Sequence, residues 1–193
     1  MRTKLLYSRE EMQKINIETL YSRGVTVEDI AAIAWKQQSK YTPDIPMSVA
    51  IESVEKILTY RDIFHYIQLG AEIDRLAEEH QFRGPIQDIL FHDLGLFGVD
   101  EVLGLEIAGT YGAIGKTNFG DIDVNKPGIV YKLNEMGKNE VGVINPNAKV
   151  HTMLDDIVGA IAASASTRIA QVFNEELANE DPEYQKISIF DVE

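Results

Sequence analysis

Residues 157–166 read IVGAIAASAS, a run in which every side chain is apolar or small. Wound as a helix, this run has no polar face, and such a helix is normally buried, with small side chains that let other helices approach closely. The surrounding stretch 151–173 has the length of one long helix, with Thr152 as its predicted N-cap and Asp155 and Asp156 in its first turn. The sequence therefore predicts a central helix with two carboxylates at its buried or half-buried start.

Helix-start signals recur along the rest of the chain, whereas strand signals are few and short. Helices are predicted from capping residues at Ser8, Thr26, Ser48 and Thr59, and from Pro85 at a first helical position. Together with helical spacing further on, these signals give predicted helices at about 8–23, 26–40, 48–58, 59–80, 85–93, 99–108 and 129–136. The glycine-rich segment 109–128 is interpreted as a short helix and an ordered loop. The predicted fold class is all-α: a single-domain helical bundle whose central small-residue helix is surrounded by about five or more others.

The length of 193 residues suits one domain with a sizeable core. Two prolines in TPDIP, at 42–46, interrupt the helical pattern and mark a boundary. Residues 1–45 are therefore predicted to form an N-terminal helical extension packed on the core. Residues 46–180 are predicted to form the main helical domain, and residues 181–193 a C-terminal tail.

Charge and residue usage exclude several classes of function. The chain has 31 acidic and 18 basic residues, and its formal net charge of -13 disfavours binding to nucleic acid or non-specific adsorption to anionic membranes. Without cysteine there is no disulfide, thiolate nucleophile or zinc–cysteine site, and a cytoplasmic location fits. We expect no signal peptide and no transmembrane segment, because no stretch reaches about 18 uncharged apolar residues.

Two acidic pairs occupy the first turns of two predicted helices: Asp100-Glu101 and Asp155-Asp156. Acids in a first turn are common simply because they stabilise the helix, so one pair alone is a weak signal. Two matched pairs, without a set of His or Cys ligands, suit a hard cation such as Mg²⁺. The polar segment between them adds further candidates: Lys116, Thr117, Asn118, Asp121, Asp123 and Lys126. A lysine or amide there suits a phosphate, so the pattern predicts metal-assisted phosphoryl hydrolysis.

Three blocks of the sequence resemble a known family in order and spacing: VDEVLGLEIAG (99–109), NFGDIDVNKPG (118–128) and HTMLDDIVGAIAA (151–163). They are similar to the successive blocks of the phosphatidylglycerophosphatase A family, above all its soluble branch from low-GC Gram-positive bacteria, which includes low-temperature-requirement C proteins. The likeness covers most of the chain from about residue 45 onward, and LDDIVGAI is its most specific part. The resemblance implies an all-helical fold and hydrolysis of phosphatidylglycerophosphate to phosphatidylglycerol and phosphate, with Mg²⁺.

The resemblance also implies roles for five acidic residues that hold the ion and handle water: Asp100, Glu101, Asp123, Asp155 and Asp156. Of these, Asp100 and Asp155 are metal-ligand candidates, Asp123 is a catalytic candidate, and Glu101 and Asp156 are candidates for both roles. The candidates for substrate binding are Lys126, to which the resemblance gives the phosphate, and Lys116 and Asn118 from the polar segment.

The expected partner is a phospholipid substrate at the inner face of the cell membrane, with the protein bound there peripherally. Membrane-bound members of the family have an early glycine- and proline-rich block and transmembrane helices, which residues 1–98 lack. Two alternatives therefore stay open: a soluble phosphomonoesterase with a non-lipid substrate, and a non-catalytic helical interaction protein linked to growth in the cold. The small-residue central helix also leaves room for a homo-oligomer.

Two further motifs are given structural interpretations. GKT at 115–117 is not a P-loop, because position 110 is Thr110 rather than glycine and a helix is predicted where a P-loop needs a strand. His151 directly precedes the second acidic pair, but a lone histidine is more often structural than catalytic.

Overall fold

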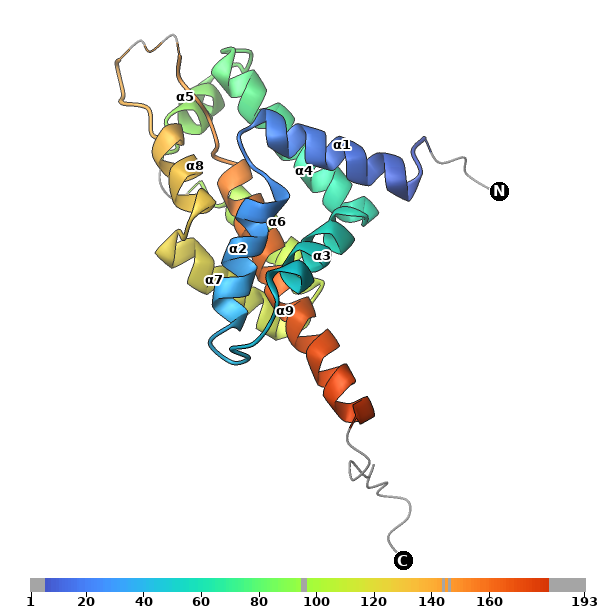
Figure 1. Cartoon of the computed structure of the whole chain (residues 1–193). Helices are drawn as coiled ribbons and strands as arrows, with labels where there is room; N and C mark the ends of the chain where they lie inside the picture. The colour runs from blue at the N-terminus through green and yellow to red at the C-terminus, as the bar shows by residue number, and fades with distance from the viewer. Residues whose placement is uncertain (1–5, 95–96, 144, 146, 181–193) are drawn as a thin grey trace, which may run out of the picture.

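The computed structural model describes residues 6–94, 97–143, 145 and 147–180. Across these residues it contains nine α-helices and no strand, which confirms the all-α prediction (Figure 1). The helices are α1 (Arg9–Ser22), α2 (Val27–Gln38), α3 (Met47–Leu58), α4 (Arg61–Glu78), α5 (Pro85–Phe91), α6 (Val99–Gly109), α7 (Gly112–Asn125), α8 (Ile129–Gly137) and α9 (Leu154–Glu180). The predicted C-terminal tail at 181–193 lies outside the described residues.

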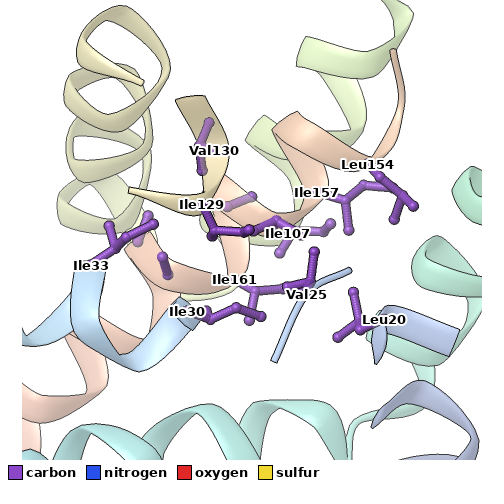
Figure 2. Packing of buried hydrophobic residues seen from close by; sticks show 14 of the residues in the cluster. Leu20, Val25, Ile30, Ile33, Ile107, Ile129, Val130, Leu154, Ile157 and Ile161 are labelled. Carbon is purple, nitrogen blue, oxygen red and sulfur yellow. The ribbon is translucent and has the colours of Figure 1, made fainter. Parts of the chain in front are cut away.

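Helix α9 is the central element, as the small-residue run predicted. Helices α2, α3, α6 and α7 pack directly along it, and α4 and α8 contact it as well (Figure 1). Every residue from Leu154 to Thr167 is buried. In Figure 2, Ile157 and Ile161 of α9 lie among apolar side chains that come from the surrounding helices, such as Ile107 of α6.

Close helix approach to α9 depends on glycine at one position of α4. A Cβ atom added to Gly70 would lie 2.4 Å from Cδ1 of Ile157, a distance at which the side chain or the helix would have to move. Gly70 therefore lets α4 come up against the start of α9, although a mid-helix glycine costs about 1 kcal/mol in intrinsic helix propensity. This contact matters for the site, because α4 also carries Asp74, the residue that caps the start of α9.

The sequence located several helix starts correctly. Ser8 and Thr26 form capping boxes with Glu11 and Asp29, and Pro85 is the first residue of α5. At two other helices the predicted capping residue is wrong. Helix α3 begins at Met47, after Pro46, and α4 begins after Tyr60, in both cases without a side-chain cap.

The hydroxyl of Thr59, predicted to cap α4, instead donates to the carbonyl of Lys56 at the end of α3. Ser48 lies inside the first turn of α3, because the extended backbone of Pro46 already starts the helix. The ends predicted for α1 to α6 and for α8 agree with the structure to within about two residues, the usual uncertainty of helix boundaries. The central helix, predicted at 151–173, begins later, at Leu154, and continues to Glu180.

The prediction of a short helix and loop at 109–128 is wrong in its loop. Residues Gly112–Asn125 form one continuous helix, α7. A Cβ atom added to Gly115 would lie 2.2 Å from the carbonyl oxygen of Ala108, so this glycine allows α7 to pack against α6. Glycines in a sequence favour a loop prediction, whereas Gly115 is required for helix packing. GKT lies inside α7, which agrees with the rejection of a P-loop.

Helix α2, within the predicted N-terminal extension, packs directly on α9 and α3. The indole N–H of Trp35 donates to the carbonyl of Ile45, which ties the following link back to α2. Among the described helices, none combines the length and hydrophobicity required to cross a membrane.

Candidate active site

The start of α9 is held by a buried carboxylate from another helix. Asp74 of α4 accepts hydrogen bonds from the backbone N–H groups of Met153 (3.0 Å) and Leu154 (3.1 Å), and it is fully buried. These bonds satisfy two of the donors that a helix N-terminus leaves unpaired. Thr152, the predicted N-cap, has a different role, because its hydroxyl donates to the carbonyl of Leu90 (2.7 Å).

The cap formed by Asp74 makes a prediction about stability. Replacing Asp74 by alanine leaves two buried N–H groups without partners, and we expect a loss of about 2–4 kcal/mol in the free energy of unfolding. The Asp74→Asn variant retains one acceptor oxygen and should lose less. Urea denaturation of both variants measures the difference. An alanine variant as stable as the parent would show that Asp74 does not hold the start of α9.

The two acids of α9 meet a lysine from the end of α7. The ammonium of Lys126 lies 3.3 Å from Oδ2 of Asp155 and 3.2 Å from Oδ1 of Asp156. It also lies 2.5 Å from Oδ1 of Asp123, one turn earlier on α7. Three of the predicted acids and the predicted phosphate-binding lysine therefore converge, although 29 and 30 residues separate Lys126 from the two acids of α9.

The backbone at the end of α7 directs this lysine inward. Lys126 is the C-cap of α7, in the left-handed conformation with φ of 40°, and its N–H donates to the carbonyl of Ile122. A residue other than glycine rarely adopts that conformation. Pro127 and Gly128 follow, and Gly128 also has a positive φ, of 58°. The turn ends α7 sharply and leaves the side chain of Lys126 against α9.

The first acidic pair completes one cleft with the second. The cleft has a volume of about 260 Å³, and Asp100, Glu101, Asp123, Asp155 and Asp156 all line it beside Lys126. Asp100 is buried, and its Oδ1 accepts the N–H of Glu101 (2.9 Å). Glu101 is exposed, so its carboxylate stands at the solvent side of the cleft.

The predicted site did not include several residues that line the cleft: Asp93, Leu94, Phe97 and Asn134. Asp93 follows α5 and has a positive φ of 46°. That strained conformation is a structural sign of a constrained site, but nothing in its sequence context sets this aspartate apart from an ordinary residue at a helix end. Asn134 projects from α8, a helix with no acidic pair to mark it.

Two predicted substrate-binding residues lie away from the cleft. The side-chain amide of Asn118 donates to the hydroxyl of Thr167 on α9 (3.1 Å). Lys116 is exposed, and its aliphatic chain lies against Gly109. Neither residue lines the cleft.

Burial controls the protonation of the site. It raises the pKa of Asp155 and of Asp156 above the ordinary carboxyl range, and the proximity of Asp155 raises the pKa of Asp156 further. The ammonium of Lys126 acts in the opposite direction on both. Burial also raises the pKa of Asp100 and of Asp93. The raised pKa values mean that the negative charge of these carboxyl groups is poorly stabilised in the cleft. Binding of a cation would stabilise that charge and is therefore favoured.

Lys126 remains protonated in this environment. Burial alone lowers its pKa, but the carboxylates of Asp155, Asp123 and Asp156 outweigh burial and raise the pKa above the ordinary lysine value. His151, by contrast, is buried with both ring nitrogens unpartnered, and burial, with the nearby charge of Arg23, lowers its pKa to about 4. His151 is therefore neutral at physiological pH.

The donor set of the cleft fits Mg²⁺, which takes oxygen ligands. Within the described residues, no three carboxylates or imidazoles are already arranged around one point that would hold an ion. Mg²⁺ is normally held by one or two carboxylates, with waters and substrate phosphate completing the shell, so a preformed cage is not required. Asp155, Asp156 and Asp100 are the buried carboxylates available for it.

The chain is similar to several known proteins over most of its length. The Bacillus subtilis protein YpjQ, which is uncharacterised, is 42% identical over 177 residues, covering 92% of this chain and 94% of YpjQ. The crystal structure of YpjQ has a TM-score of 0.79 and covers 88% of this chain and 99% of that one. The low temperature requirement C protein of Listeria monocytogenes is 40% identical, with a TM-score of 0.77, and the match covers 84% of this chain and 97% of the other.

A family model also matches the chain. The model for phosphatidylglycerophosphatase A matches residues 30–171, a range that includes both acidic pairs and Lys126. The resemblance inferred from the three sequence blocks is thereby confirmed, and the Listeria neighbour agrees with the predicted branch. The chain therefore belongs to the phosphatidylglycerophosphatase A family.

Proposed function

We propose that the protein is a Mg²⁺-dependent phosphatase that hydrolyses phosphatidylglycerophosphate to phosphatidylglycerol and phosphate. The observation that carries the proposal is the convergence of the acidic pairs of α6 and α9 on Lys126 in one cleft. Membership of a family described as phosphatidylglycerophosphatase A supports the reaction class.

The residues of the cleft suit the parts of such a reaction. When bound, Mg²⁺ would polarise the phosphoryl group and acidify the attacking water. Asp155 and Asp156 would hold the ion, with Asp100 beside them. Lys126 would neutralise the charge that develops on the phosphate oxygens. Glu101, which is exposed at the solvent side, would accept a proton from water.

Apolar side chains in the cleft and on the helix beside it support a lipid substrate. Leu94 and Phe97 line the cleft itself. Val99 and Val102, on the same helix as the first acidic pair, are 50% and 62% exposed. Such side chains next to a site for a phosphate suit a substrate whose charged headgroup is joined to hydrocarbon.

Phosphate release tests the proposal directly. We expect release from phosphatidylglycerophosphate in mixed micelles that requires Mg²⁺ and stops with a chelator. Water-soluble phosphomonoesters, such as p-nitrophenyl phosphate, provide the comparison. Hydrolysis of soluble esters alone would favour the non-lipid phosphomonoesterase, and no hydrolysis of either class would favour the non-catalytic interaction protein.

The exposed valines of α6 make a separate prediction. The double variant Val99→Gln, Val102→Gln adds no charge and introduces a better helix former at both positions, so the fold and the cleft should be unchanged. We expect a several-fold lower rate on the lipid in vesicles and an unchanged rate on a water-soluble ester. Ile114→Gln on α7, which removes another exposed apolar residue, is the matched control. Equal effects on both substrates would contradict a role of these valines in lipid contact.

A further inference from the structure

A second cavity lies on the other side of the α7–α8 turn from the acidic cleft, between α2, the end of α7 and the start of α8. Its volume is about 590 Å³, within the range of roughly 300–1,000 Å³ typical of small-molecule sites. Asn125, Pro127 and Gly128 line this cavity, whereas Lys126, between them, lines the cleft. The two hollows share no lining residue, so the cavity is not an extension of the candidate active site.

Three lysines line the cavity: Lys36 on α2, Lys40 just after it, and Lys132 across from them on α8. In the part of the chain that the structure describes, none of the three forms a salt bridge. The three lysines line one cavity, and like charges gathered in one cavity repel each other. An anion between the lysines would relieve that repulsion.

Two of the three acids in the lining are already engaged by neighbouring groups. Asp29 accepts the N–H of Thr26 (3.0 Å) and its hydroxyl (2.8 Å) in the capping box of α2. Asp121 accepts the side-chain amide of Asn125 (3.0 Å). Glu28 is the third acid of the lining. Among the described residues Glu28 forms no salt bridge either, so the cavity holds three unpaired lysines against one unpaired acid.

Gln37 gives an independent indication of a ligand. It lines the cavity and is only 8% exposed. Its Nε2 donates to the carbonyl of Asn118 (3.2 Å) and to Oδ2 of Asp121 (3.4 Å), both acceptors, which fixes the orientation of the amide. Its Oε1 has no hydrogen-bond partner. A buried acceptor without a donor is uncommon, and a ligand hydroxyl would supply one.

We propose that this cavity is a binding site for a small phosphorylated polyol. A phosphate carries a charge of about −1.5 to −2 at neutral pH and three acceptor oxygens, which matches three lysine ammonium groups. A hydroxyl of the same molecule donates to Oε1 of Gln37. Ile33 and Ile129 line the cavity and also belong to the buried core (Figure 2), so they give the cavity an apolar side. The site is independent of the proposed hydrolysis.

Isothermal titration calorimetry of the full chain with glycerol 1-phosphate tests the proposal. A chelator is included, so that no divalent ion occupies the cleft. The double variant Lys36→Gln, Lys132→Gln should bind about tenfold more weakly or worse, because two charge-assisted contacts are lost. Lys56→Gln, which changes an exposed lysine on α3, should bind like the parent. Titration with phosphatidylglycerol vesicles shows whether the cavity binds the headgroup of a lipid or a free phosphate ester.

The role of Gln37 is tested by a second ligand. Methyl phosphate has no hydroxyl on its alkyl group, so the parent should bind it several-fold more weakly than glycerol 1-phosphate. Gln37→Met should remove this preference. The proposal is overturned if neither glycerol 1-phosphate nor vesicles bind, or if the lysine double variant binds like the parent. It is equally overturned if Lys126→Met alone abolishes binding, which would place the ligand in the cleft. Because binding is measured without metal or turnover, a failure of the proposed phosphatase activity leaves this result unaffected.

Discussion

Replacing Asp156 by asparagine should lower the rate of Mg²⁺-dependent phosphate release by about 10³-fold, since a metal ion contributes several kcal/mol of transition-state stabilisation. Asp156 is 3% exposed and touches the ammonium of Lys126, so the asparagine stays in place while the negative charge is lost. Phosphate release measured across a range of Mg²⁺ concentrations separates weaker metal binding from slower chemistry.

Folding of the same variant provides a second measurement. Burial raises the pKa of Asp156, so the folded protein disfavours the ionised form, and the neutral amide should not reduce stability at neutral pH. Mg²⁺ should stabilise the parent against heat by about 2.7 kcal/mol at 100 times its dissociation constant. The asparagine variant should show little of that stabilisation.

Asp62→Asn is the matched control, because Asp62 also lies in the first turn of a helix, α4, but is exposed to solvent. If first-turn acids serve only to stabilise helices, the two variants should behave alike. A parent that gains no stability from Mg²⁺, with both variants equally active, would contradict the metal site.

Local patterns in the sequence were sufficient to predict the central helix and the two acidic pairs. The small-residue run of α9 has no polar face. First-turn acids and capping boxes are patterns of residues a few positions apart, so all these features can be recognised without the tertiary structure. The order of the blocks that contain Asp100, Lys126 and Asp156 also indicated the family. The structure then brings these residues into one cleft.

The features that the sequence did not reveal depend on contacts between distant residues. Asp74 caps α9 from 79 and 80 residues away, and Thr152, the obvious local cap, bonds elsewhere. The glycines of α7 resemble loop residues until Gly115 is seen to face a carbonyl of α6. A lysine in the left-handed conformation, as at Lys126, cannot be expected from propensity, because ion pairs with Asp155 and Asp156 of another helix stabilise it.

Replacing Lys126 by methionine should have the second large effect, a fall in kcat of about 10²- to 10³-fold, comparable to the loss of one preorganised donor at a developing negative charge. The same change should move the acidic limb of the pH–rate profile upward. Lys126 favours the ionised forms of Asp155 and Asp156 and so lowers their pKa values against the effect of burial. Without the ammonium these pKa values rise, and a higher pH is needed to deprotonate the metal-binding pair.

The pH dependence distinguishes this role from a merely structural one. Loss of phosphate contact alone would lower the rate equally at every pH, whereas the electrostatic coupling in the cleft requires the acidic limb to shift as well. Lys56→Met, on the exposed face of α3, should change neither the rate nor the profile. If the Lys126→Met enzyme keeps the rate and pH profile of the parent, the ammonium of Lys126 neither changes the pKa values of the neighbouring aspartates nor contacts the phosphate. The assignment of the cleft as an active site would then have to be abandoned.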